Sequence, residues 1–153
     1  MSTTATISRV IEQNDNGFKV ESVYVRYDGH KVGETLKSCY NTEDKVIELI
    51  SHGAIVSLGK MITYEPNSFP GCQYESTNFC KQVYNADCSK CCRAVCEFYY
   101  RNYGHDWNDC KPKIYTVKKL SDLRNINQEE YNYIFMDGKW YVRRDYSNRL
   151  KEV

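Results

Sequence analysis

The stretch Tyr131-Asn-Tyr-Ile-Phe-Met-Asp-Gly-Lys-Trp-Tyr-Val142 decides the fold class of this chain. Every second residue from 131 to 135 is aromatic, and Trp140 and Val142 alternate after Asp137-Gly138. An Asp-Gly pair between two alternating runs is typical of a β-hairpin with a two-residue type I′ turn. In that register Phe135 faces Trp140 and Tyr133 faces Val142, so the sequence predicts one apolar face of an antiparallel sheet.

A second hairpin is predicted near the N-terminus. Residues 3–11 are rich in β-branched side chains, 14–17 read Asn-Asp-Asn-Gly, and 18–27 again suit a strand. The apolar phase changes within 18–27, and a β-bulge near Glu21 and Ser22 would restore one buried face. The strand is expected to end at Asp28-Gly29 and to continue as a loop to Gly33.

Two helices are expected between the hairpins. Thr42, with two acidic residues after it, predicts the start of a helix over 42–52, and Gly53 suits its end. A second helix is predicted over 85–103, with Gly104 as its terminator. Residues 113–117 suit a short strand, and 121–125 suit one helical turn.

These elements predict one α+β domain over 1–153, with an antiparallel sheet built from two β-hairpins plus a short strand and packed against two helices. Its expected parts are the hairpin and helix of 1–60, the Cys-rich helical segment 72–110, and the strand and closing hairpin of 111–146. A chain of 153 residues is long enough to bury a core of its own.

Composition limits the function classes. The 21 basic and 20 acidic residues give a net charge of +1, so binding of nucleic acid driven by bulk charge is not expected. No run approaches the ~20 apolar residues of a membrane span, and no secretion signal is visible. We therefore expect a cytoplasmic protein without a membrane partner. Residues 111–153 hold 10 basic and 6 acidic residues and form the basic part of the chain.

Cysteine is concentrated in one segment. Seven of the eight cysteines lie between 72 and 110. Zinc is the alternative that these thiols leave open, with a ligand set drawn from Cys80, Cys88, Cys91, His105 and Cys110. No second Cys-x-x-Cys pair follows, however, and the spacing of Cys88, Cys92 and Cys96 suits a helix face packed in a core. We favour packing, and disulfides are the least favoured reading for a cytosolic protein.

The loop Arg26, Asp28, His30 and Lys31 is the candidate ligand- or partner-binding surface, since it brings an acid, an imidazole and two cations together. The alternative is a solvated turn. Cys88 near a helix start is a weak candidate nucleophile, but no base is paired with it by any motif. No phosphate loop, nucleophile elbow or zinc-protease motif is present. We expect no catalytic residue and no cofactor.

The C-terminal basic residues interleave with aromatic ones, a pattern that single-strand binders share. Since Trp140 belongs to the apolar hairpin face, Arg143 falls on the other side, and we expect a solvated strand face there. The residues of this stretch are Lys139, Arg143, Arg144, Arg149 and Lys151, with Trp140, Tyr141 and Tyr146.

Residues 24–59 resemble an uncharacterised family of small proteins encoded by bacteriophages and prophages. Members show a strand ending in Tyr-x-His-Trp-Asp-Gly-Tyr, then Gly-x-x-Leu, a Tyr-x-x-x-x-x-Val helix and Ile-Ser-x-Leu-Gly. The matching residues here are Tyr24, Asp28, Gly29, Val32, Gly33, Thr35, Leu36, Tyr40-Asn41-Thr42, Lys45, Val46, Leu49, Ile50, Gly53, Ile55, Ser57, Leu58 and Gly59.

The resemblance extends to Tyr99–Gly104 and to the closing hairpin, and it omits 72–96. The chain departs from the family at Arg26, Tyr27 and His30, where members have His, Trp and an aromatic residue. The resemblance implies a phage or prophage origin and a compact fold, and it implies no reaction.

The sequence thus predicts a non-enzymatic accessory protein that binds a host or phage macromolecule or sequesters a small anionic ligand. A zinc-stabilised interaction module is the alternative. Self-association is left open.

Overall fold

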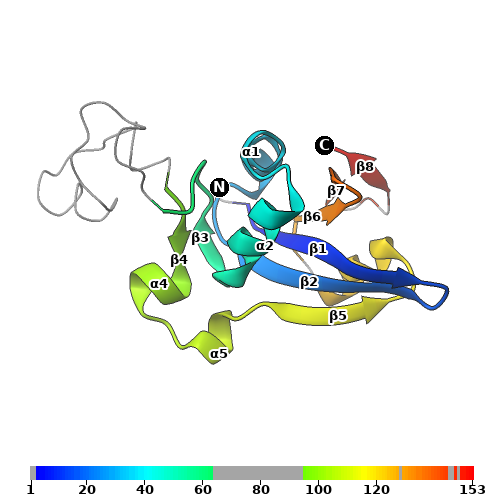
Figure 1. Ribbon diagram of the computed structural model, residues 1–153, viewed down its shortest axis with the longest axis horizontal. Helices are drawn as coiled ribbons and strands as arrows, with labels where there is room; N and C mark the ends of the chain where they lie inside the picture. The colour runs from blue at the N-terminus through cyan, green and yellow to red at the C-terminus, as the bar shows by residue number, and fades with distance from the viewer. Residues whose placement is uncertain (1–2, 64–94, 128, 145–146, 148) are drawn as a thin grey trace, which may run out of the picture.

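One mixed sheet organises the molecule (Figure 1). The computed structural model describes residues 3–63, 95–127, 129–144, 147 and 149–153. Among these residues the sheet has eight strands. Seven run in the order β4-β3-β2-β1-β6-β7-β8, and the eighth, β5, pairs with β2. The strands are β1 (Ala5–Asn14), β2 (Gly17–Val25), β3 (Ile55–Ser57), β4 (Glu97–Phe98), β5 (Lys113–Val117), β6 (Tyr131–Met136), β7 (Lys139–Arg144) and β8 (Leu150–Glu152).

Both predicted hairpins are confirmed. β1 pairs antiparallel with β2, and β6 pairs antiparallel with β7 in the expected register, with Phe135 opposite Trp140 and Tyr133 opposite Val142. Asp137 and Gly138 have φ angles of 53° and 76°, the left-handed pair that a type I′ turn requires.

The prediction of a purely antiparallel sheet is wrong. β1 pairs parallel with β6, and β2 pairs parallel with β3. Alternation and turn chemistry specify pairing within a hairpin, but they carry no information on how two hairpins meet. The α+β class of a single domain is confirmed, with a mixed sheet.

The expected bulge is in the other strand. The register shifts between Val10 and Glu12 of β1, not near Glu21 and Ser22. The phase change in β2 has another cause: Val20 packs in a core on one face of the sheet, and Val23 and Val25 pack in a core on the other. A strand that is covered on both faces needs no single apolar phase.

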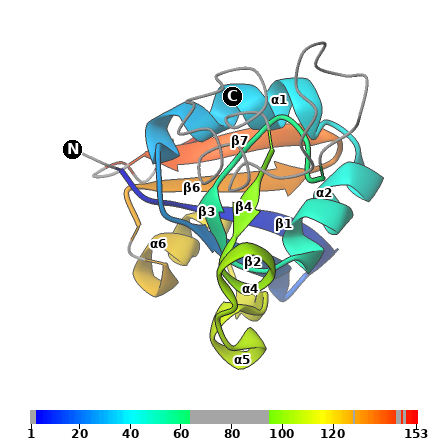
Figure 2. The same cartoon turned by 90° about the vertical axis from the view of Figure 1, so that its left-hand side faces the viewer.

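Two helices cover one face of the sheet, which we call the helix face (Figures 1 and 2). Helix α2 (Glu43–Ser51) confirms the predicted start, since the Thr42 hydroxyl accepts a hydrogen bond from Lys45 N at 3.4 Å. Gly53, with φ 81°, follows its end. Helix α1 (Val32–Cys39) and the 3₁₀ turn Gly29–Lys31 were not predicted. A short helix with glycine at its second position carries a weak sequence signal.

The predicted helix over 85–103 is wrong where the structure describes it before residue 99. Residues 85–94 lie outside the described part of the chain, and Glu97–Phe98 form β4. Only α4 (Tyr99–Tyr103) is helical, and Gly104 ends it as expected with φ 69°. α5 (Trp107–Cys110) follows, and the expected turn near 121–125 is confirmed by a 3₁₀ turn and α6 (Leu123–Ile126).

The sheet has a core on each side. Val25, Leu36, Leu49, Ile55 and Phe98 belong to the larger core under α1 and α2. On the opposite face a smaller core lies around α6. It contains Val20, Val117, Leu120, Leu123 and Ile134.

Cys96 is buried, as the packing interpretation expects, but it lies just before β4 and not on a helix face. It is fully buried in the larger core, and its Sγ lies 3.3 Å from Tyr40 Oη and 3.2 Å from Gly59 N. Burial raises the pKa of the Cys96 thiol, so it stays protonated. Cys88, Cys91 and Cys92 lie outside the described residues.

The expected solvated strand face at Arg143 is wrong. Arg143 lies on the opposite face from Trp140, as predicted, but it is only 1 % exposed. Its Nε donates to Asn132 Oδ1 at 2.7 Å, and its other nitrogens donate to the carbonyls of Glu129, Arg144 and Ser147. The guanidinium is buried because backbone carbonyls and an amide satisfy its donors.

Helix α1 is held against the sheet by two aromatic donors of the closing hairpin. Tyr133 Oη donates to Gly29 O at 2.6 Å, just before the helix, and Trp140 Nε1 donates to Tyr40 O at 2.7 Å, just after it. A Cβ on Gly33 would lie 2.9 Å from the Tyr133 ring, so only glycine allows this approach. Each end of α1 is therefore bonded to the sheet.

Replacing Trp140 with Phe should lower the free energy of unfolding by about 2 kcal/mol, because the carbonyl of Tyr40 loses its buried donor. Urea denaturation followed by circular dichroism measures the change. Trp107→Phe is the matched control, since Trp107 is 37 % exposed and should shift stability by less than about 0.5 kcal/mol. Equal effects of the two substitutions would contradict a clamp at Trp140.

Candidate functional site

A groove lies between α1 and the C-terminal strands on the helix face. Its volume is about 810 Å³. Tyr131, Tyr133 and Val142 line it from the sheet, and Gly33, Glu34 and Lys37 line it from α1. The remaining lining residues are His30, Arg144, Ser147, Arg149, Lys151, Glu152 and Val153. We call this the basic groove.

Strand register brings the cations of the basic groove together. Arg144 lies opposite Tyr131 across β6 and β7, and Lys151 lies opposite Val142 across β7 and β8. Side chains two residues apart share a face, so Arg144 stands on the same face as Val142 and Lys151. Arg149 directly precedes β8 and lies beside them in the groove.

The groove has an excess of positive charge. Five basic side chains line it, namely His30, Lys37, Arg144, Arg149 and Lys151, against the two carboxylates of Glu34 and Glu152. Glu152 lies 3.8 Å from Lys139, which is outside the groove. In the part of the chain that the structure describes, none of the five basic side chains makes an ion pair. The charges of Lys37, Arg144, Arg149 and Lys151 are therefore available to an anion.

The floor of the groove is aromatic. The rings of Tyr131 and Tyr133 are nearly parallel, with an interplanar angle of 11° and centroids 6.2 Å apart. Burial raises the pKa of Tyr133 to about 12, so its hydroxyl stays protonated and donates to Gly29 O. The floor therefore presents uncharged rings below a rim of cations.

The structure separates the four residues of the predicted binding loop. His30 lines the basic groove, where its Nδ1 lies 2.8 Å from Thr3 Oγ1. Asp28 and Lys31 line a different hollow of about 180 Å³. Arg26 lines neither of these two hollows, and its Cζ lies 5.4 Å from the centroid of the Tyr27 ring. Of the four residues, His30 alone lines the basic groove.

The basic stretch near the C-terminus holds the groove residues that the loop hypothesis missed. Arg144, Arg149 and Lys151 line the groove, whereas Arg143 is buried and Lys139 lies outside. The local charge excess was a valid signal. No sequence signal identified Lys37 as a groove residue, because helix α1, which carries it, was not predicted.

The proposed zinc ligands are only partly described. Cys80, Cys88 and Cys91 lie outside the described residues. Cys110 is buried, which raises the pKa of its thiol, and His105 is exposed with its ring edge against Tyr99. Among residues 3–63, 95–127 and 129–153 with their gaps, no three His, Cys, Asp or Glu side chains form a metal-sized group. None of the described helices is long and apolar enough to cross a membrane.

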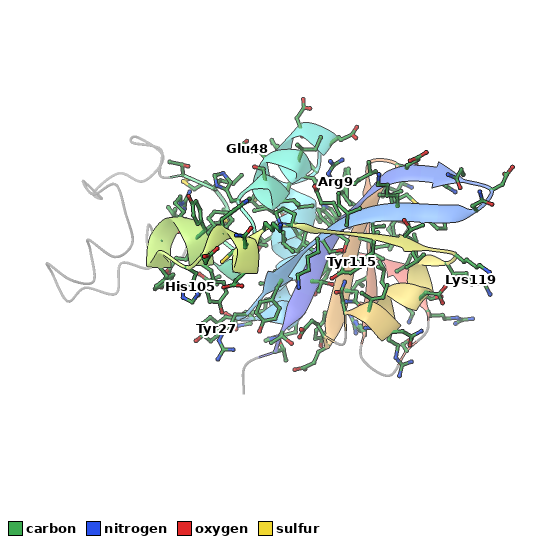
Figure 3. All side chains as sticks on the ribbon, turned by 90° about the horizontal axis from the view of Figure 1, so that it is seen from below. Arg9, Tyr27, Glu48, His105, Tyr115 and Lys119 are labelled. Atoms are coloured by element: carbon green, nitrogen blue, oxygen red, sulfur yellow. The ribbon has the colours of Figure 1, made fainter. Side chains whose placement is uncertain are left out.

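A third surface lies at the end of the sheet that carries α4 and α5, where Figure 3 labels Tyr27 and His105. Tyr100 and Tyr103 are each 50 % exposed, and Tyr27 and Trp107 are also exposed. Tyr103 Oη donates to Glu97, and this bond raises the pKa of Tyr103 to about 12. Amphipathic rings in this number are common at protein interfaces.

Comparisons of the chain with family models, with curated proteins and with solved structures found no match. The resemblance to phage and prophage proteins therefore stays a prediction.

Stability should fall above pH 10 in a way that depends on Tyr133. The pKa of Tyr133 is raised to about 12 in the folded chain, so the unfolded chain loses this proton at a lower pH than the folded chain does. The free energy of unfolding therefore falls between about pH 10 and pH 12. Tyr133→Phe should cost about 1–2 kcal/mol at pH 8 and should flatten this decline. Urea midpoints from pH 8 to 12 measure both effects.

Tyr100→Phe is the matched control, since Tyr100 is 50 % exposed, lies outside the groove and leaves Tyr133 intact, so the decline above pH 10 should persist. A Tyr133→Phe protein with the full wild-type loss of stability above pH 10 would contradict the assignment.

Proposed function

We propose that this chain is a non-enzymatic accessory protein that sequesters a small organic anion in the basic groove. The observation that carries the proposal is the set of five basic side chains without ion pairs among the described residues, placed around a groove of about 810 Å³. Pockets for small molecules commonly have volumes of about 300–1,000 Å³.

The arrangement of the groove favours one ligand class. Guanidinium groups bind phosphate and carboxylate oxygens through paired donors, and Arg144 and Arg149 supply two of them. The rings of Tyr131 and Tyr133 offer an apolar surface beneath. A molecule with a ring at one end and a phosphate at the other, such as a nucleoside monophosphate, complements both parts.

Binding should depend on charge. Because the cations are exposed, salt screens their attraction, and affinity for an anion should fall as ionic strength rises. Isothermal titration with AMP, inorganic pyrophosphate and uncharged adenosine measures the contribution of each part. We expect AMP and pyrophosphate to bind and adenosine to bind at least tenfold more weakly than AMP.

Charge reversal locates the site. Arg144→Glu with Lys151→Glu should weaken AMP binding by more than tenfold, since two attractions become repulsions. Lys45→Glu with Lys118→Glu changes the net charge equally at exposed positions outside the groove and should change affinity less than twofold. Equal loss in the two double variants, or no binding of either anion, would refute the proposal.

A second candidate function is binding of a macromolecule through the exposed rings near α4. Tyr and Trp side chains dominate the binding energy of many protein interfaces, and Tyr100, Tyr103 and Trp107 supply them here. This candidate corresponds to the other half of the sequence-based prediction, which is the binding of a host or phage macromolecule.

A further inference from the structure

The outer edge of β5 carries an inference that is independent of the basic groove. β5 pairs with β2 on one side, and no other described strand pairs with it. Figure 1 shows β5 along the lower border of the sheet, and Figure 3 shows the same strand from below, with Tyr115 labelled. The outer side of such a strand holds backbone donors and acceptors to which an added strand can bond.

The backbone bonds of β2 alternate between its two sides. β1 lies on one side of β2, and β3 and β5 lie on the other. Just past the end of β2, Arg26 N donates to Ile55 O of β3. Because successive residues of a strand turn their backbone groups to opposite sides, the even-numbered residues of β2 turn theirs toward β3 and β5.

This alternation decides which groups of β5 face outward. Val20 lies directly opposite Tyr115, so Tyr115 exchanges its backbone bonds with β2. Ile114 and Thr116, on either side of Tyr115, turn their N–H and C=O groups away from the sheet. Among the described residues, no backbone hydrogen bond joins these outward groups to another element.

The middle of this edge is apolar and accessible. Ile114 is 55 % exposed, which is the largest exposure among the large hydrophobic side chains that the structure describes. It lies opposite Glu21, whose carboxylate is bound by Arg9 at 3.0 Å. An edge that only avoids pairing carries charges or proline in its middle, whereas this one has Ile-Tyr-Thr-Val over 114–117. The composition of the strand therefore favours pairing with a partner.

Lysines lie at both ends of this apolar middle. Residues 111–119 contain four lysines and no acidic residue, and all four lysines are exposed. In the part of the chain that the structure describes, none of the four makes an ion pair. Asp109 and Glu129 line a hollow beside Lys111 and Lys113, and neither carboxylate lies within ion-pair distance of these lysines. The lysines remain available to carboxylates of a partner.

These charges select among the strands that could pair with β5. A second copy of the chain would place its own four lysines along those of the first, so the edge repels itself. An extended segment with acidic side chains gains both the main-chain bonds and the attraction to the lysines. A nucleic acid would satisfy the lysines alone, because it lacks amide donors and acceptors at the spacing of a strand.

We infer that the outer edge of β5 binds an extended acidic peptide segment of a partner protein as an additional β-strand. Main-chain bonds to Ile114 and Thr116 fix the register of the peptide. An apolar side chain of the peptide packs on Ile114, and its carboxylates pair with lysines such as Lys113 and Lys118.

Amide NMR of the isotope-labelled full chain tests this inference. The probe is a capped nonapeptide in which glutamate alternates with valine. At saturation it should slow hydrogen exchange of the Ile114 and Thr116 amides by roughly tenfold or more, and the Tyr115 amide, already bonded to β2, should change by less than about twofold. Pyrophosphate, the probe of the basic groove, should not displace the peptide. No change at Ile114 and Thr116 would overturn the inference.

Matched probes separate strand pairing from charge. The same peptide N-methylated at two adjacent central residues keeps its carboxylates but cannot donate there on either side, and it should bind roughly tenfold more weakly. A peptide of alternating lysine and valine should not bind. An oligothymidylate of the same length tests nucleic acid. Equal affinity for the methylated peptide, or tighter binding of the oligothymidylate, would show attraction of anions without an added strand and would contradict the inference.

Thr116→Pro supplies the decisive variant. It removes an outward N–H and no bond to β2, so it should weaken binding of the acidic peptide by roughly tenfold or more, and the melting temperature should shift by less than about 4 °C. Tyr115→Pro is the counterpart, because it removes a bond to β2 and should lower the melting temperature further. The reverse order of the two melting temperatures would show that the other residues face outward, and it would refute the assignment.

Charge reversal tests the choice of partner without changing the backbone. Lys113→Glu with Lys118→Glu should weaken binding of the acidic peptide by roughly tenfold or more and should create binding of the lysine peptide. Lys31→Glu with Lys45→Glu makes the same change of net charge at exposed positions outside 111–119 and should keep wild-type affinity. Equal affinity in the two double variants, or a dimer of the free chain through Ile114 and Thr116, would refute the proposed partner.

Discussion

Two hydrogen bonds from aromatic side chains set the position of α1, and much of the helix face depends on them. Tyr133 and Trp140 come from the closing hairpin, and they bond to backbone carbonyls at the two ends of the helix. Between these bonds, the helix backbone packs directly against the Tyr133 ring, because Gly33 has no side chain. Because both ends are tied to β6 and β7, the helix forms one wall of the basic groove, and the residues around β8 form the other.

The two faces of the sheet are covered by different kinds of side chain. The helix face is sealed by apolar side chains, whereas the opposite face is apolar only around α6. Elsewhere it buries polar groups that bond to one another, such as Asn132 with Arg143 and Ser8 with Ser22. Such networks cost little when every member is satisfied.

Local chemistry explains which parts of the fold the sequence could predict. The Asp137-Gly138 turn, the Thr42 cap and the terminating Gly104 act through neighbouring backbone atoms, and all three are confirmed. The parallel pairing of β1 with β6 joins residues about 126 positions apart, and no local pattern encodes it. The alternation of apolar and polar residues along β7 predicts a solvent-exposed side chain at Arg143 only if one face of the strand is in contact with water. Both faces of this strand are covered, so Arg143 is buried.

The candidate site was predictable to a smaller extent. His30 and the basic C-terminal residues were identified separately, as a loop and as a charged stretch. His30 and the basic C-terminal residues lie around one groove because of the position of α1 and the register of β7 with β8. Neither feature was predicted from the sequence.

The central place of β1 has a consequence for biosynthesis. β6 leaves the ribosome more than a hundred residues after β1, so one of the two edges of β1 stays unpaired until β6 is synthesised. Until then the nascent chain carries an open strand edge that can recruit other strands. We therefore expect the docking of β6 onto β1 to be a slow step of folding. A chaperone that shields the hairpin of β1 and β2 would protect the open edge until that step is complete.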